Sequence, residues 1–150
     1  DLEKKYSEVA VSYEFVDAVA MRLVQWPNSY DVLITENLFG DILTDEASVI
    51  SGSMGLMPSA SIGLENALYE PIHGSFPQAT GLGIANPLAM ILSTAMMFEM
   101  SFNLNEEGFT IRNAVNKSLA DGKVTKDLAE KDVGYYSTSE VGDYLVKLIK

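Results

Sequence analysis

The sequence predicts an α/β fold in which helices flank a mixed sheet, because strand-like and helix-like segments alternate along its first third. Ser7 to Glu14 alternates apolar and polar side chains, a period of two that indicates a strand. A helix with an apolar face follows from about Asp17 and stops at Trp26-Pro27-Asn28, since proline disfavours a helical residue before it. Tyr30 to Thr35 is short, apolar and β-branched, as expected of a buried strand. Asn37 can then cap a second helix that runs to about Ile50, and this alternation indicates layered α/β architecture.

The rest of the chain contains fewer strands and more helices. Residues 51–63 are rich in glycine and serine and lack a helical period, so we expect a crossing segment there and a domain change near residues 51–54. A short strand at Ala67–Glu70 and a long loop at 71–86 are expected after it. Asn86-Pro87 then begins a buried helix that ends near Ser101, and a further helix is expected at about Gly108–Ala120. A looser segment with a possible strand at Lys123–Ser137 precedes a terminal helix to Lys150, which Thr138-Ser139-Glu140 caps.

Composition narrows the class of protein. Hydrophobic residues make up 47% of the 150 residues and charged residues 21%, which is typical of a globular domain. A net charge of −11 without a basic stripe argues against a nucleic-acid partner. The longest apolar run, Leu88 to Met100, is too short to span a membrane, and with no cysteine and no signal peptide we expect a cytoplasmic protein. The only two arginines, Arg22 and Arg112, cannot form the cluster that usually clamps a di- or tricarboxylate.

Asp41 and Asp45 are the first candidate site. They are four residues apart, so both carboxylates project from one face if this stretch is helical. At about 5–6 Å their repulsion is roughly 3 kcal/mol for an effective dielectric near 20, which a divalent cation would offset. Two hard oxygen donors on adjacent turns suit Mg²⁺ or Mn²⁺. The alternative is a solvated acidic start of a helix.

The loop from Glu70 to Asn86 is the second candidate site. It holds the only histidine, His73, together with glycines that let a backbone approach a ligand, and the helix after it offers free N–H groups to a phosphate. A nucleotide could bind there, although no G-x-G-x-x-G follows a strand, and the alternative is an ordinary surface loop. No Lys or Arg lies between Pro71 and Pro87 to pair with a 2′-phosphate, which favours NAD over NADP.

Three motifs in order carry a family resemblance over about residues 13–90. They are Asn37-Leu-Phe-Gly-Asp-Ile-Leu-Thr-Asp45, Gly52-Ser-Met-Gly-Leu-Met-Pro-Ser-Ala-Ser61, and Glu70-Pro-Ile-His-Gly-Ser75 with Gly81-x-Gly-Ile-Ala-Asn-Pro87. With them the sequence resembles the isocitrate/isopropylmalate family of β-decarboxylating dehydrogenases, and the middle motif leans toward its isopropylmalate branch. The resemblance implies metal- and NAD-dependent oxidation of a 2-hydroxy acid followed by loss of its β-carboxylate, as a step in leucine biosynthesis.

The resemblance also assigns residues. The metal ligands that it implies are Asp41 and Asp45, with Asp17 reaching the site of a partner subunit. The cofactor-binding residues that it implies are Glu70 near the nicotinamide ribose and His73, Gly74, Ser75, Ala85 and Asn86 around the adenosine. Gln78 stands where NAD-using members usually carry Asp, and its amide can still hydrogen-bond the ribose hydroxyls.

The organisation implied by the resemblance is the C-terminal part of a two-domain enzyme. Residues 1–52 would end a substrate and dimerisation domain, residues 53–150 would form the later half of a nucleotide-binding domain, and helices near 16–26 and 40–51 would pair two subunits in a homodimer. The family's substrate arginines, tyrosine and general-base lysine lie in segments before residue 1, so we expect this chain alone to be inactive. The alternatives are a related isocitrate, homoisocitrate or tartrate dehydrogenase, or a non-catalytic dimerisation fragment.

Overall fold

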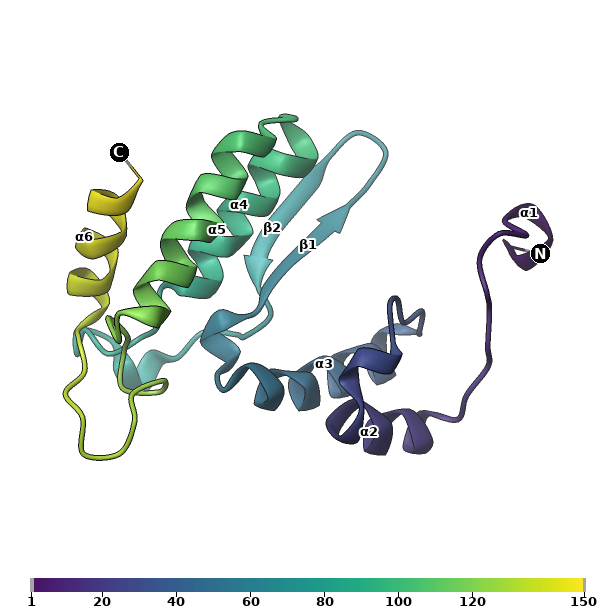
Figure 1. The fold of residues 1–150 in the computed structure, drawn as a ribbon, viewed down its shortest axis with the longest axis horizontal. Helices are drawn as coiled ribbons and strands as arrows, with labels where there is room; N and C mark the ends of the chain where they lie inside the picture. The colour runs from purple at the N-terminus through teal and green to yellow at the C-terminus, as the bar shows by residue number, and fades with distance from the viewer. Residues whose placement is uncertain (1, 150) are drawn as a thin grey trace. The chain divides into compact units, whose positions relative to one another are not determined.

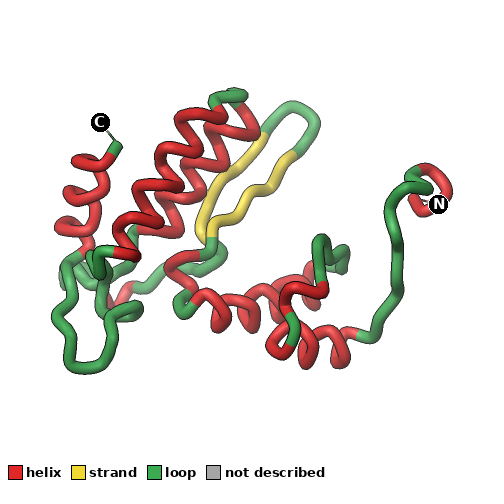
Figure 2. The backbone as a smooth tube through the Cα atoms, viewed as in Figure 1, coloured by secondary structure: helices red, strands yellow, loops and turns green. Residues whose placement is uncertain are grey.

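The computed structural model describes residues 2–149, which form two compact units divided between Ala47 and Ser48 (Figure 1). Helices and one small antiparallel sheet make up its regular elements (Figure 2). The predicted α/β class with flanking helices is therefore confirmed, but within the described residues the sheet is antiparallel and not mixed, because its only two strands are joined as a hairpin. Of the described helices, none combines the length and the apolar character that a membrane span requires.

The first unit is built on the packing of two helices. It contains the short α1 (Leu2–Lys5), α2 (Val16–Gln25), a 3₁₀ turn η1 (Pro27–Ser29) and α3 (Asn37–Ser51) as far as Ala47. Val19 and Leu23 of α2 are buried with Leu43 of α3, so the expected apolar face of the first helix is confirmed at these positions. Val24, near the end of α2, is 53% exposed and lies outside this buried face.

The two strands expected in this unit do not form. Residues 7–14 and 30–35 are irregular, and they are drawn as loop in Figure 2. A strand is held by hydrogen bonds to a neighbouring strand, and the described residues offer neither segment such a neighbour. Apolar residues of these segments consequently remain exposed, as at Val32 and Ile34.

The start of α3 also differs from expectation. The helix begins at Asn37 itself, and its first backbone bond runs from the Gly40 N–H to the Glu36 carbonyl. Asn37 therefore does not cap the helix; its side-chain Nδ2 donates to the Asp41 carboxylate at 3.2 Å.

In the second unit one helix packs against a hairpin, and two further helices follow behind it. Strands β1 (Pro58–Ile62) and β2 (Ala67–Pro71) pair antiparallel with Ser59 opposite Glu70. Helix α4 (Leu88–Ser101) contacts both strands and α5 (Asn105–Ala120), and α6 (Thr138–Leu148) contacts α5 (Figure 1). The core between the helices consists of Leu88, Ala114, Val115, Val141 and Leu145.

Element boundaries in the second unit partly follow the sequence. The strand expected at Ala67–Glu70 is confirmed. Helix α4 begins at Leu88, one residue after the expected Pro87, and the side chain expected to cap it still does so, because Asn86 Oδ1 accepts from the Leu88 N–H at 3.0 Å. The expected crossing segment at residues 51–63 contains β1 and the 3₁₀ turn η2 (Met54–Leu56), neither of which was expected there. Pairing with β2 stabilises β1, and no local pattern marks such a partner.

Several expectations for the last third of the chain are corrected by the structure. Helix α5 begins at Asn105, before the expected Gly108, and no strand forms in residues 123–137. The terminal helix ends at Leu148, and its cap is Ser137, one residue before the expected Thr138. Ser137 and Glu140 bond each other's backbone N–H groups in a capping box, which places the helix start at Thr138.

Candidate functional site

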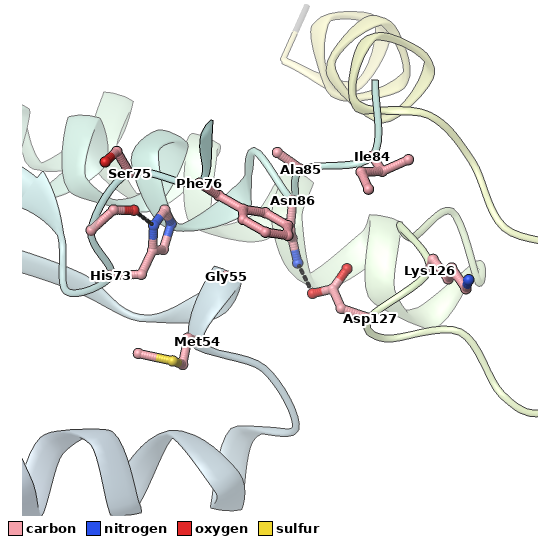
Figure 3. Close-up of a pocket in the computed structure, with 11 residues that line it drawn as sticks. Met54, Gly55, His73, Ser75, Phe76, Ile84, Ala85, Asn86, Lys126 and Asp127 are labelled. Atoms are coloured by element: carbon pink, nitrogen blue, oxygen red, sulfur yellow. Dashed lines mark hydrogen bonds between the residues drawn. The ribbon is translucent and has the colours of Figure 1, made fainter. Parts of the chain in front are cut away.

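A cavity of about 660 Å³ opens in the second unit, where three segments of the chain meet (Figure 3). Its size lies in the usual range for small-molecule sites. The segments are η2 and two parts of the chain that flank it in space, the loop before α4 and the irregular stretch after α5. The lining residues are Met54, Gly55, His73, Gly74, Ser75, Phe76, Ile84, Ala85, Asn86, Lys126 and Asp127.

Asp127 ties these segments together. Its carboxylate accepts hydrogen bonds from Ser53 Oγ at 2.5 Å, from Asn86 Nδ2 at 2.9 Å and from Thr125 Oγ1 at 2.5 Å. Burial raises the pKa of this carboxyl, but the three side-chain donors outweigh it, so the pKa lies below the ordinary aspartate value. The ionised carboxylate therefore holds one wall of the cavity in place.

Asn86 is held from both sides of its amide. Its Oδ1 caps α4 while its Nδ2 donates to Asp127. Gly55 approaches it so closely that a Cβ added there would lie 2.6 Å from the Asn86 Cβ, well inside van der Waals contact. Glycine at position 55 is what allows η2 to lie against the start of α4.

His73 lies on the other side of the cavity in Figure 3. Its Nδ1 lies 3.0 Å from the Gly74 carbonyl oxygen, which can only accept, so the proton of the neutral ring sits on Nδ1. Nε2 is then an acceptor, and it can receive an N–H or O–H donor from an occupant of the cavity.

Most of the expected cofactor residues gather around this cavity. Those that line it are His73, Gly74, Ser75, Ala85 and Asn86. Glu70, in β2, and Gln78, in the 3₁₀ turn η3 (Pro77–Ala79), are not among the lining residues, and their roles stay predictions.

Sequence reasoning missed the other lining residues. Met54 and Gly55 stand inside a quoted motif without having been assigned a role, and Phe76 and Ile84 flank assigned positions. Lys126 and Asp127 come from a segment far along the chain, where no local pattern indicates a site.

The expected metal ligands all lie in the first unit. Asp41 and Asp45 stand on one continuous helix, α3, so they have the helical spacing that the sequence analysis assumed. Asp17 lies on α2, where its Oδ1 accepts from the Ala18 N–H at 2.8 Å. Within residues 2–149 no three or more His, Asp or Glu side chains are grouped so that they could hold a metal ion. The metal site, which was expected to draw on two subunits, stays a prediction.

Comparison with known sequences identifies relatives along the entire chain. A profile of the isocitrate/isopropylmalate dehydrogenase family matches residues 1–145. The chain is 52% identical over 150 residues to the 3-isopropylmalate dehydrogenase of Bacteroides fragilis (strain YCH46), covering 100% of this chain and 42% of that protein. It is 50% identical to the 3-isopropylmalate dehydrogenase of Mannheimia succiniciproducens, covering 99% and 42% of the two chains. The chain thus spans less than half the length of these relatives.

Solved structures give the same picture. The isocitrate dehydrogenase from Methylococcus capsulatus superposes with a TM-score of 0.93 at 40% identity, over 99% of this chain and 43% of that one. A β-decarboxylating dehydrogenase from Thermococcus kodakarensis superposes with a TM-score of 0.82 at 38% identity, over 97% and 42%. Sequence and fold agree, and the chain belongs to the isocitrate/isopropylmalate dehydrogenase family.

Proposed function

We propose that this chain is part of a metal- and NAD-dependent oxidative decarboxylase of 3-isopropylmalate, a cytoplasmic homodimer that serves leucine biosynthesis. The observation that carries the proposal is the cavity, since the loop expected to hold adenosine lines it with two stretches, residues 73–76 and 84–86. The substrate is inferred from relatives that are named 3-isopropylmalate dehydrogenase and align with the whole chain.

In this proposal the cavity holds the adenosine half of the dinucleotide. Asn86 and Asp127 keep the walls in register, and His73 offers a hydrogen-bond acceptor to the base or ribose. Glu70 and Gln78, which are not among the lining residues, would hydrogen-bond the two riboses. Lys126 also lines the cavity although it lies outside the loop, so the lack of Lys and Arg between Pro71 and Pro87 does not by itself exclude a 2′-phosphate. The comparison of NAD with NADP described below decides between the two cofactors.

The metal would be held by Asp41 and Asp45 of one subunit and Asp17 of the other. The donor set fits a hard divalent cation, because all three ligands are carboxylates and these helices carry them on exposed surface. When bound, Mg²⁺ or Mn²⁺ supplies Lewis-acid polarisation of the substrate's hydroxyl and carboxylate oxygens. The contribution of the chain itself is to place two negative side chains one helical turn apart and to pair α2 and α3 with a second copy.

Two alternatives to this function predict different experimental results. A related dehydrogenase would act on isocitrate, homoisocitrate or tartrate, and the likeness to a solved isocitrate dehydrogenase favours isocitrate among these. A dimerisation fragment would associate without binding nucleotide.

The test uses the intact protein that carries this chain. With Mn²⁺ and NAD, we expect 3-isopropylmalate to be oxidised with formation of NADH, and isocitrate, homoisocitrate, tartrate and NADP to be used at least tenfold less efficiently. A preference for another acid would overturn the substrate, and a preference for NADP would overturn the cofactor. The 150-residue chain alone should form no NADH, because the proposal places the general base and the substrate arginines outside it; turnover by the chain alone would contradict that placement.

A further inference from the structure

Phe76 is a large apolar side chain that lines the cavity and yet remains 61% exposed. It lies in the middle of the view in Figure 3, with His73 on one side and Asp127 on the other. Among the described residues its ring has no aromatic partner, since the pair formed in this structure is Phe98 with Phe102. A ligand that covered this exposed ring would remove apolar surface from water, and this burial would favour binding.

The backbone beneath this ring is firmly placed. Pro77 follows Phe76 and keeps it out of the helical conformation, as its φ of −125° and ψ of 73° reflect. The Phe76 carbonyl accepts from the Ala79 N–H at 3.0 Å, and the Pro77 carbonyl accepts from the Thr80 N–H at 3.1 Å. Ala79 is buried, which fastens the turn to the unit. The position of the ring therefore does not depend on a mobile loop tip.

The surroundings of the ring suit a flat ligand. Gly74, two residues before Phe76, has nothing within 4 Å of the place where a Cβ would stand, which leaves open space beside the backbone. The acceptor Nε2 of His73 and the amide of Asn86 lie in the same lining. A planar ring with polar edges could cover Phe76 with its face while its edges meet these groups.

From this arrangement we propose that Phe76 is a stacking platform for the planar base of the bound nucleotide. The inference rests on the proposed nucleotide binding and adds to it a residue that contacts the base. Stacking is tolerant of base identity because every base has a π-face, so Phe76 holds the base and the polar groups select it. One stack of a base on an aromatic side chain typically changes affinity by about tenfold or more.

The test compares three forms of the intact protein: unaltered, Phe76→Leu and Phe76→Tyr. Calorimetry measures their affinities for adenosine 5′-monophosphate and for ribose 5-phosphate, which lacks the base. We expect Phe76→Leu to weaken binding of the monophosphate about tenfold or more, Phe76→Tyr to keep it within about threefold, and ribose 5-phosphate to bind all three forms alike. Equal binding of the monophosphate by Phe76→Leu would overturn the stack, as would an equal loss for both ligands together with a lowered melting temperature.

A spectroscopic variant gives a second readout. Trp26 is the only tryptophan of this chain and lies in the other unit, so within this chain Phe76→Trp in a Trp26→Phe background places a single indole at the cavity. Adenosine 5′-monophosphate should quench its fluorescence and ribose 5-phosphate should not. Unquenched fluorescence at a saturating monophosphate concentration would refute stacking while leaving nucleotide binding intact. If the unaltered protein bound neither the monophosphate nor NAD, the proposed function itself would fail.

Discussion

Gly55→Ala is the most direct test of how the cavity is built. Gly55 belongs to η2, and an added Cβ would lie 2.6 Å from Cβ and 2.8 Å from Cγ of Asn86. The Cβ of Asn86 is fixed to its backbone, so no side-chain rotation can relieve this contact. Either η2 or the start of α4 must move, and movement of Asn86 also strains its bonds to Leu88 and Asp127.

The expected magnitude combines opposing effects. Crowding of a well-packed site costs about 1–3 kcal/mol. Alanine restricts the unfolded chain more than glycine does, which raises the free energy of unfolding by about 0.4–1 kcal/mol. This gain applies here because Gly55 does not have a positive φ, which alanine would adopt only with strain. Partial loss of the Asn86 cap adds about 0.5–2 kcal/mol. We therefore expect a net loss of about 0.5–5 kcal/mol in the free energy of unfolding.

Urea unfolding of the intact protein, followed by circular dichroism, measures this loss. Gly142→Ala is the matched control, because Gly142 lies inside α6 and its added Cβ would meet nothing within 4 Å. That control should be more stable than the unaltered protein by about 0.5–1 kcal/mol, since alanine is the better helix former. If Gly55→Ala were as stable as the unaltered protein, the close approach of η2 to Asn86 would be refuted.

Three further changes test other contacts. Asp127→Asn should lower stability by about 1–2 kcal/mol at neutral pH, because an amide cannot accept from all three donors and the site is partly exposed. The folded pKa of Asp127 is depressed, so the stability that its carboxylate contributes is fully present above the ordinary pKa of about 3.9 and is lost as pH falls through the folded pKa. The urea midpoints of the unaltered protein and of Asp127→Asn should therefore converge in acid. A difference between the two midpoints that stayed constant with pH would contradict this. Mn²⁺ should raise the melting temperature of the intact protein, Asp45→Asn should abolish the gain, and Glu46→Gln, which removes the neighbouring charge, should keep it; an equal gain in Asp45→Asn would leave only a solvated acidic helix. Gly108→Ala should lower the free energy of unfolding, measured in urea, by about 1–3 kcal/mol. The added Cβ would lie 2.5 Å from Cγ of Glu99 and would displace the Glu99 carboxylate, which accepts two hydrogen bonds of 2.7 Å from Arg112. Unchanged stability would show that the Glu99 carboxylate moves aside freely.

The helices could be predicted from the sequence because their signals are local. Apolar spacing marked α2 and α3, and Asn86-Pro87 marked the start of α4, since a cap and its helix are neighbours in the chain. Where a capping residue had similar neighbours, as at Ser137 and Thr138, the prediction missed by one position.

A strand forms only when another strand pairs with it, and the local sequence pattern does not indicate which segment that is. Residues 7–14 and 30–35 have strand-like side chains, yet no strand forms there among the described residues. β1 has serine and glycine around it and forms because β2 pairs with it. The pattern of one segment describes its own side chains and leaves its pairing open.

The sequence by itself determined the family, the helical framework and the loop around His73, because motifs and apolar periods are written in consecutive residues. Only the tertiary structure brought Asp127 to Asn86, placed Gly55 against it and left Phe76 uncovered at the cavity. These relationships join positions separated by tens of residues, and they arise from packing and hydrogen bonding between segments, which no local pattern encodes.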